Sequence, residues 1–334
     1  MSALPQANDP RWLLKTIFSR KERTIPAAIL ISLTFVCNGL TPVVVGQAID
    51  RAIAVGSIST LWVWVVILLG IFIVNAAAGW FGRALFQRAG LEIGHVLRMT
   101  VTDRISHPRG MAGKQRTAGE LLAIASSDTQ RVADAVIMTV FPFAEITSII
   151  YVAVMVSSVN LPLGLGVLLG GPVVVMISLK SATPLRKRSG ARQRALAAAS
   201  ATATDVVQGL RILKGLGAVD TVRSRYEVVS DKAYEKTVAA NGAQARLNAV
   251  TETAGAFYVI IVGVVSGVMA LAEMMTVGEL ITVVGLTQFI ITPMTMLGKN
   301  IASRWATAQA SGRRIQEPLL ADASFSTSYP SLPA

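Results

Sequence analysis

Six long apolar runs constrain this chain more than any other feature of its sequence. About 20 helical residues cross a hydrocarbon core that is about 30 Å thick. Each run is long enough to do so, and the sequence therefore predicts an all-α integral membrane protein with six transmembrane helices. The runs lie near residues 25–54, 61–82, 136–158, 161–179, 250–272 and 278–303.

The composition agrees with a chain whose main solvent is lipid. Hydrophobic residues make up 52% of the chain and charged residues 15%, whereas a soluble domain carries about 25% charged residues. These values exclude a soluble enzyme, a disordered protein and a disulfide scaffold. Cys37 is the single cysteine, and His95 and His107 are the two histidines, so we expect no disulfide, no metal site and no catalytic residue.

The positive charges are distributed in a way that predicts the topology. Five Lys and Arg residues precede the first run, eight lie in 83–135, thirteen in 180–249 and four near the C-terminal end, whereas 159–160 and 273–277 hold none. By the positive-inside rule, both termini and both long connections are cytoplasmic. The chain has a net charge of +12, and its basic residues alternate with long apolar blocks. This pattern indicates a lipid bilayer as the partner rather than a nucleic acid.

The two long connections have helical patterns of their own. They contain 53 residues (83–135) and 70 residues (180–249), with apolar side chains at helical spacing in 119–136 and 191–214. The transmembrane helices are therefore expected to continue into the cytoplasm as hairpins, each projecting about 40 Å or more. A compact inserted domain is the alternative, but these segments carry little apolar content for a core.

Short segments near the ends of the runs resemble those of a known family. Residues 10–14 (PRWLL) resemble an elbow helix along the inner leaflet, and residues 42–50 (PVVVGQAID) resemble the end of a first span. Residues 275–280 (MTVGEL), continuing to Pro293, resemble a sixth helix, and residues 310–315 (ASGRRI) resemble its exit from the membrane.

The long connections contain two more such segments. Residues 117–121 (TAGEL) followed by Asp128 resemble a T-G-[ED]-L…D pattern. Residues 205–214 (DVVQGLRILK) resemble E-x-x-x-G-[IL]-R-x-[VI]-K, with Asp205 where glutamate is commoner. In this order and spacing, the segments resemble the transmembrane domain of an ABC transporter of the exporter type, the type IV fold of bacterial half-transporters, over residues 10–315.

The resemblance implies a domain organisation and a mechanism. Residues 1–24 are expected to form a cytoplasmic N-terminus with an interfacial elbow helix. Residues 25–315 are expected to form the six-helix domain with cytoplasmic hairpins 83–135 and 180–249, and residues 316–334 a linker or disordered tail. In this family, coupling helices at the hairpin tips dock on nucleotide-binding domains.

By position, the coupling helices are expected near 113–119 and 218–226. The alternative is that these charged residues form only the solvated tips of helical hairpins. The residues expected to contact nucleotide-binding domains are Lys114, Arg116, Thr117, Ala218, Asp220, Arg223, Arg225 and Tyr226.

The sequence contains no G-x-x-x-x-G-K-[ST] loop for nucleotide phosphates and no LSGGQ-like signature. The chain is therefore not expected to hydrolyse ATP alone. ATP and Mg are expected on nucleotide-binding domains supplied by the same parent chain or by a separate subunit. Six helices are half of the family's usual pathway, so a second transmembrane subunit is expected, as a homodimer or heterodimer.

Polar and aromatic residues within the apolar runs are candidates for a substrate pathway. A carboxylate or amide at membrane depth faces either a cavity or a neighbouring helix to which it hydrogen-bonds, and aromatic residues at helical spacing also occur in packing. Both interpretations stay open for these side chains. The candidates are Asn38, Asn75, Glu145, Tyr258, Gln288 and Phe289.

The function implied is that of a membrane-spanning subunit of an ATP-driven transporter working by alternating access. Export of an amphipathic compound, a lipid or a peptide across a bacterial inner membrane is expected. The alternatives are an ABC importer of the same fold, for example for a siderophore, and a membrane transporter or scaffold that does not use ATP. A secondary transporter would usually contain an inverted repeat with broken helices, which this sequence does not show.

Overall fold

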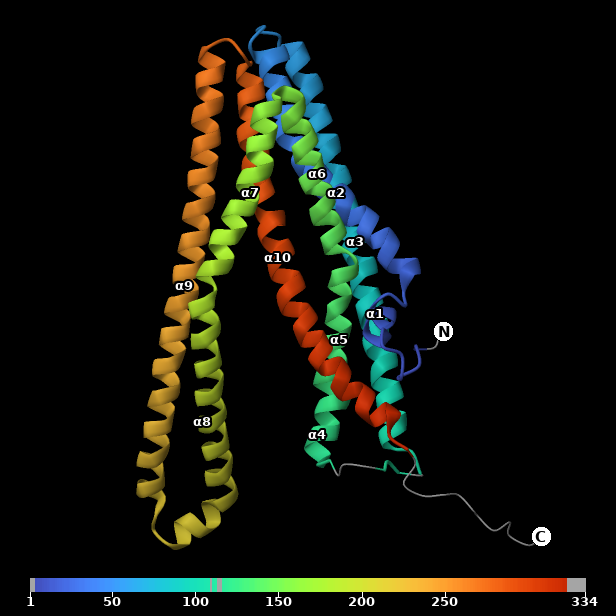
Figure 1. The fold of residues 1–334 in the computed structure, drawn as a ribbon, viewed down its shortest axis with the longest axis vertical. Helices are drawn as coiled ribbons and strands as arrows, with labels where there is room; N and C mark the ends of the chain where they lie inside the picture. The colour runs from blue at the N-terminus through green and yellow to red at the C-terminus, as the bar shows by residue number, and fades with distance from the viewer. Residues whose placement is uncertain (1–3, 109, 113–115, 323–334) are drawn as a thin grey trace, which may run out of the picture. The chain divides into compact units, whose positions relative to one another are not determined.

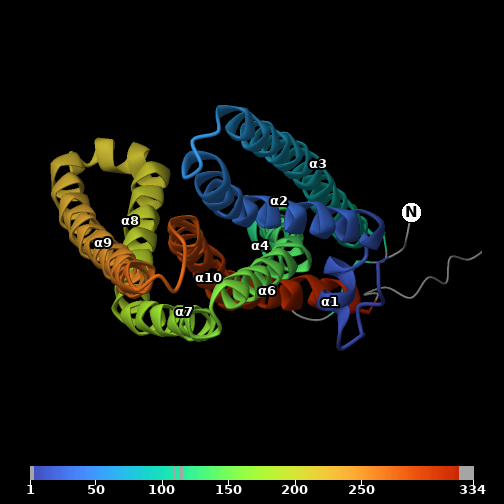
Figure 2. The ribbon, with the colours of Figure 1, turned by 90° about the horizontal axis from the view of Figure 1, so that it is seen from above.

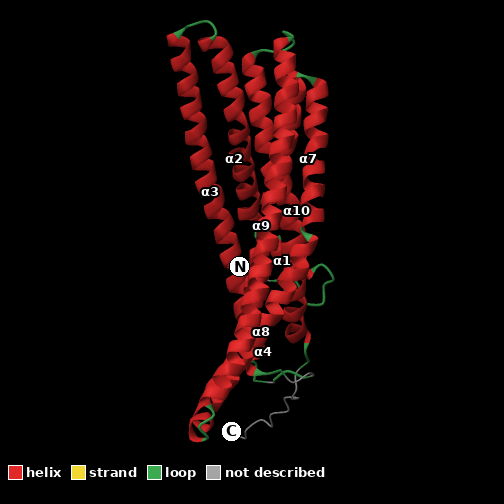
Figure 3. Cartoon of the chain, turned by 90° about the vertical axis from the view of Figure 1, so that its left-hand side faces the viewer, coloured by secondary structure: helices red, strands yellow, loops and turns green. Residues whose placement is uncertain are grey.

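The computed structural model describes residues 4–108, 110–112 and 116–322, with the backbone alone for 298–303. Within these residues the chain forms helices and no strands (Figure 3), which confirms the all-α prediction. The elements are α1 (Trp12–Ile17), α2 (Lys21–Ala48), η1 (Ile49–Ile53), α3 (Ile58–Ile105), α4 (Ala118–Ala123), η2 (Ile124–Asp128), α5 (Thr129–Asp134), η3 (Ala135–Thr139), α6 (Phe141–Val159), α7 (Leu161–Ser181), α8 (Thr183–Gly215), α9 (Val219–Leu271) and α10 (Val277–Leu320).

Six helical stretches are long and apolar enough to cross a membrane, and each predicted span overlaps one of them. Several helices are much longer than a bilayer requires. α3 has 48 residues and α9 has 53, whereas about 20 residues suffice. The helical extensions predicted for 83–135 and 180–249 are therefore present in the described residues. α10 continues to Leu320, so the first residues of the expected tail 316–334 are helical.

The two extensions differ in regularity. After α3, the chain turns through Gly110, whose φ of 64° lies in the left-handed region that glycine adopts readily. It then returns as α4, η2, α5 and η3, of which η2 is a π-helical turn and η3 a 3₁₀ helix. The second hairpin turns once, where Ala218 N–H donates to Leu213 O (3.0 Å) and Gly217 has a φ of 65°. This is a Schellman motif, which ends α8 and lets α9 begin.

The described chain divides into two compact units. The first contains residues up to Leu168 and from Val262 onward, and in it α2 contacts α3, α6 and α10 (Figures 1 and 2). Figure 2 shows α6 lying against α10. Ala27, Ile31 and Ala144 are buried between α2 and α6, whereas Trp62 and Trp80 on α3 are exposed, as lipid-facing side chains would be.

A second core of this unit joins α1, α3, η2, α5, η3 and α10. Trp12, Ile93, Leu97, Val136 and Ile315 are fully or almost fully buried in it. Here α1 forms the short helix predicted near residues 10–14, anchored by Trp12 and Ile17, whereas Leu14 is 42% exposed.

The second unit contains residues 169–261, namely most of α7, all of α8 and most of α9. α8 and α9 lie side by side as a hairpin (Figure 1), and Arg188 on α8 donates to Ala239 O on α9 (3.3 Å). α7 and α9 meet at Gly170, where an added Cβ would lie 2.1 Å from Tyr258 Cε2. Gly170 therefore serves packing within one chain.

In the first unit, α2 and α10 approach each other closely. A Cβ added at Gly46 would lie 2.1 Å from Thr282 Oγ1 and 2.3 Å from Gly278 O. One turn earlier on α2, Pro42 fills the space that a Cβ at Gly285 would need, at 2.5 Å. These small residues let the two backbones touch, as in other membrane helix pairs.

We predict that Gly46→Ala lowers the free energy of unfolding by about 1–3 kcal/mol, because the new methyl group meets a backbone oxygen that cannot rotate away. Thermal unfolding of the purified chain in detergent measures the effect. Gly70→Ala on α3 is the matched control, since an added Cβ there meets nothing within 4 Å. Equal stability of the two variants would contradict the close contact of α2 and α10.

Candidate functional site

The end of the first span and the start of α10 are joined by one carboxylate. Asp50 lies in the π-helical turn η1. Its Oδ2 accepts a hydrogen bond from Thr276 Oγ1 (2.5 Å), and its Oδ1 accepts one from Gly278 N–H (2.8 Å). Thr276 and Glu279 also form a capping box at the start of α10. Two segments singled out in the sequence, 42–50 and 275–280, therefore contact each other.

A second carboxylate holds the opposite part of α10. Asp128 ends the π-helical turn η2, and its side chain is fully buried. It accepts a hydrogen bond from Ser311 Oγ (2.9 Å) and pairs with Arg314 (3.3 Å) and Arg131 (3.7 Å). The segments 117–128 and 310–315 thus also meet.

The first group of predicted coupling residues takes part in contacts within the chain. Lys114 lies outside the described residues. Arg116 is 8% exposed and pairs with Glu317 on α10 (2.9 Å) and with Glu120 (4.0 Å). Thr117 caps α4 by accepting a hydrogen bond from Glu120 N–H (3.2 Å). Residues 116 and 117 are not helical, and α4 begins at Ala118. Residues 113–115 of the coupling helix expected near 113–119 lie outside the described residues.

The second group lies at the turn between α8 and α9. Ala218 belongs to the turn, and the other four residues lie in the first turns of the long helix α9 rather than in a separate short helix. Asp220, Arg223 and Arg225 are exposed, and Arg223 pairs with Glu227 (3.1 Å).

An apolar groove lies between α8 and α9 beside these charges. Its volume is about 460 Å³. Val206 and Leu210 line it from α8, and Val222, Arg223 and Tyr226 line it from α9. Unlike residues 116 and 117, this segment presents both charged and apolar groups on an exposed surface.

Among the predicted pathway residues, Asn38 and Asn75 are brought together. Asn75 Nδ2 donates to Asn38 Oδ1 (2.7 Å) and to Thr34 O (3.3 Å). Asn38 is exposed on α2, and Asn75 is partly exposed on α3. These amides therefore link α2 to α3 and also reach the surface of the chain.

The remaining candidates are spread over different contacts. Glu145 on α6 is 1% exposed, and the Phe289 ring on α10 lies 6.4 Å from the Phe35 ring on α2, tilted by 58°. Gln288 is exposed. Tyr258 belongs to the second unit and packs on Gly170.

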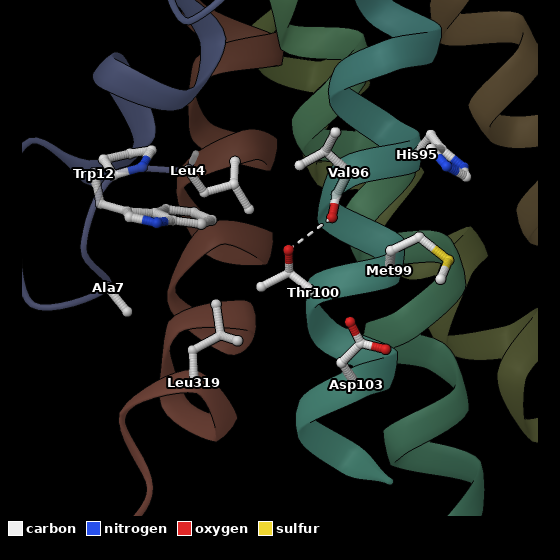
Figure 4. Close-up of a pocket in the computed structure, with 10 residues that line it drawn as sticks. Leu4, Ala7, Trp12, His95, Val96, Met99, Thr100, Asp103 and Leu319 are labelled. Atoms are coloured by element: carbon white, nitrogen blue, oxygen red, sulfur yellow. Dashed lines mark hydrogen bonds between the residues drawn. The ribbon is translucent and has the colours of Figure 1, made fainter. Parts of the chain in front are cut away.

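The groove in Figure 4 is formed by other residues. It has a volume of about 630 Å³ and lies between the N-terminal segment, α3 and the end of α10. Trp12 and Leu319 line one side, and Met99 and Asp103 of α3 line the other (Figure 4). Thr100 Oγ1 bonds to Val96 O of its own helix (2.9 Å). No residue predicted for coupling or for the pathway lines this groove.

The family described as ABC transporter transmembrane region matches residues 25–294. The chain belongs to this family. It is a multi-pass membrane protein and a membrane subunit of an ABC transporter. Membrane regions of this family pair in general with nucleotide-binding domains and a second membrane subunit. A comparison with curated proteins found no significant match.

Sequence reasoning about this ABC transmembrane region missed the structural roles of Asp50 and Asp128. Both acids belonged to segments that carried the family resemblance, but neither was a site candidate. Two signals were available in the sequence: Asp50 is an acidic residue near the end of an apolar run, and Asp128 is an acidic residue within the apolar pattern of 119–136. Their partners Thr276 and Ser311 lie 226 and 183 residues away in the sequence, so the pairing itself could not be seen.

We predict that Asp128→Ala lowers the free energy of unfolding of the ABC transmembrane region by about 1–3 kcal/mol. The substitution leaves the buried Ser311 hydroxyl without its acceptor and the Arg314 guanidinium without its carboxylate. Thermal unfolding in detergent measures the loss. Asp134→Ala on the same segment is the control, because Asp134 is exposed and bonds to its neighbour Gln130 (2.8 Å). Its effect is expected within about 0.5 kcal/mol, and a comparable loss in both variants would refute the role assigned to Asp128.

Proposed function

We propose that the chain forms the substrate pathway of an ATP-driven transporter with a second copy of itself or a related subunit. Nucleotide-binding domains carrying ATP and Mg dock on segment 218–226 and drive alternating access. The observation that carries this proposal is the exposed end of the α8–α9 hairpin, where charges of both signs lie beside an apolar groove. Such a surface suits a protein partner better than water.

The length of α9 provides a means of coupling. The helix runs without a break from Val219 to Leu271, a length of about 80 Å at 1.5 Å per residue. Its first turns carry Asp220 and Arg225, and its last part is apolar enough to cross the membrane. A displacement of the docked end is therefore passed along a continuous hydrogen-bonded rod to the span.

Residues 116 and 117 contribute differently in this proposal. Arg116 ties the first connection to Glu317 on α10, and Thr117 starts α4. They tie the start of α4 to the end of α10, so we propose that these two elements move together when the nucleotide-binding domains approach.

The proposed orientation rests on the charges. Lys and Arg residues are concentrated before the first span, in 83–135, in 180–249 and near the C-terminal end, which supports a cytoplasmic position of both termini and the hairpins by the positive-inside rule. We propose the inner membrane of a bacterium as the location.

Export of an amphipathic compound, a lipid or a peptide is the proposed direction and substrate class. The exposed amides Asn38 and Gln288 and the partly exposed Phe289 offer hydrogen bonds and apolar contact, which suits an amphipathic substrate. Glu145 is buried in the bundle and is proposed to support the pathway from within it.

We predict that reversing Asp220 and Arg225 together (Asp220→Lys, Arg225→Glu) abolishes assembly with the nucleotide-binding domain encoded with this chain, or its ATPase activity in membranes. The net charge is unchanged, so a loss reflects lost complementarity at the docking surface. Co-elution and ATP hydrolysis measure the two effects.

Arg246→Glu serves as the control for this reversal. Arg246 is exposed on the same helix and lies about 30 Å farther along it, so assembly and activity are expected to persist. If the double reversal changes neither readout, docking at 218–226 is wrong and the nucleotide-binding domain binds another part of the chain.

We predict that inside-out vesicles containing the assembled transporter take up a fluorescent amphipathic compound when ATP is added outside. Export from the cytoplasm appears as uptake in this orientation, and vesicles given a non-hydrolysable nucleotide provide the control. ATP-dependent uptake only into right-side-out vesicles loaded with ATP would instead identify an importer.

A further inference from the structure

A small cavity lies where α1 rests on α10, on a different side of α1 from the groove of Figure 4. Its volume is about 190 Å³. α1 and the residues before it contribute Arg11, Leu13 and Leu14, and α10 contributes Trp305, Gln309 and Arg313. None of these residues belongs to the proposed pathway or to the docking segment. The cavity therefore lies outside the surfaces to which a role is assigned above.

Two positively charged side chains line this cavity. Arg11 and Arg313 are exposed, and neither forms a salt bridge in the part of the chain that the structure describes. The nearby carboxylates have other partners. Asp9 pairs with Lys15, Glu317 pairs with Arg116, and Asp128 pairs with Arg314.

Asp9 pairs with Lys15 and accepts a hydrogen bond from the backbone of Arg11, and its charge also attracts the Arg11 guanidinium. The hydrogen bond from Lys15, followed by that from the Arg11 backbone N–H, lowers the pKa of Asp9, so its carboxyl group is ionised at neutral pH. Two guanidinium groups that face one cavity repel each other and attract an anion.

The cavity lies at one end of the membrane-spanning bundle. α1 ends at Ile17, and α2, the first helix apolar enough to cross a membrane, begins at Lys21. The residues just before such a span lie at the level of the lipid headgroups. Leu14, which lines the cavity, is 42% exposed, and tryptophan, here Trp305, is enriched at membrane interfaces.

We propose that this cavity binds the phosphate headgroup of an anionic phospholipid from the adjacent leaflet. The planar forks of Arg11 and Arg313 suit phosphate oxygens, and Gln309 offers a further donor. Pockets for drug-sized ligands measure about 300–1,000 Å³, so a cavity of 190 Å³ has room for a headgroup while the acyl chains remain in the bilayer beside Leu14. The bound lipid links α1 to α10.

The test is a lipid titration of the full chain in detergent, followed by native mass spectrometry. Phosphatidylglycerol and phosphatidylcholine are compared, and inorganic phosphate is added as a competitor. The variant Arg11→Gln/Arg313→Gln removes both guanidinium groups. The variant Lys21→Gln/Arg304→Gln is the matched control, because it removes two exposed charges from α2 and α10 that do not line the cavity.

The wild type is expected to bind one phosphatidylglycerol at least about tenfold more tightly than Arg11→Gln/Arg313→Gln, since hydrogen bonds to charged groups are lost. The control variant is expected to stay within about twofold of the wild type, and phosphatidylcholine is expected to bind more weakly. If the double variant does not fold, Arg11→Gln and Arg313→Gln are measured singly, with about a threefold loss expected from each.

Three results would overturn the proposal. An equal loss of affinity in the control variant would indicate general attraction to the basic surface. Equal affinity for phosphatidylcholine would exclude selection of an anionic lipid. Displacement of the lipid by inorganic phosphate at equal concentration would identify a site for free anions instead.

Discussion

The structure of the first unit depends on how α10 is held. This helix contacts α1, α2, α3, α5 and α6. One carboxylate binds its N-terminal turn, and another binds it near its C-terminal end. Asp50 binds the first turn through Thr276 and Gly278, and Asp128 binds the last turns through Ser311 and Arg314. Both acids lie in π-helical turns, which are frequent at functional positions.

Each carboxylate meets groups that can satisfy it. Asp50 accepts a backbone N–H at a helix N-terminus, where positive partial charge accumulates. Asp128 is fully buried; its Oδ1 accepts the Ser311 hydrogen bond, and its charge is paired with two guanidinium groups although Oδ2 has no hydrogen bond among the described residues. Between these points the small residues Gly46 and Gly278 let α2 and α10 touch. Polar contacts at both ends and close backbone packing thus define one rigid framework.

The two predicted docking segments play unequal roles around this framework. Arg116 pairs with Glu317 on α10, and Thr117 caps α4. These contacts give both residues a structural role. Asp220 and Arg225 are exposed at the start of an unbroken helix beside an apolar groove. The membrane-facing cavity with Arg11 and Arg313 adds a third type of surface, in which the charge selects an anion rather than a protein.

The sequence alone determined the six spans, the all-helical class and the family, because apolar length and local pattern are read along the chain. The helical extensions could also be predicted, since they follow from the spacing of apolar side chains within one segment of the chain. The tertiary structure decided which polar residues meet. The pairs Asp50–Thr276 and Asp128–Ser311 join residues separated by 226 and 183 positions, and the burial of Arg116 depends on where Glu317 lies. These contacts arise from how helices cross in space, which no local pattern records.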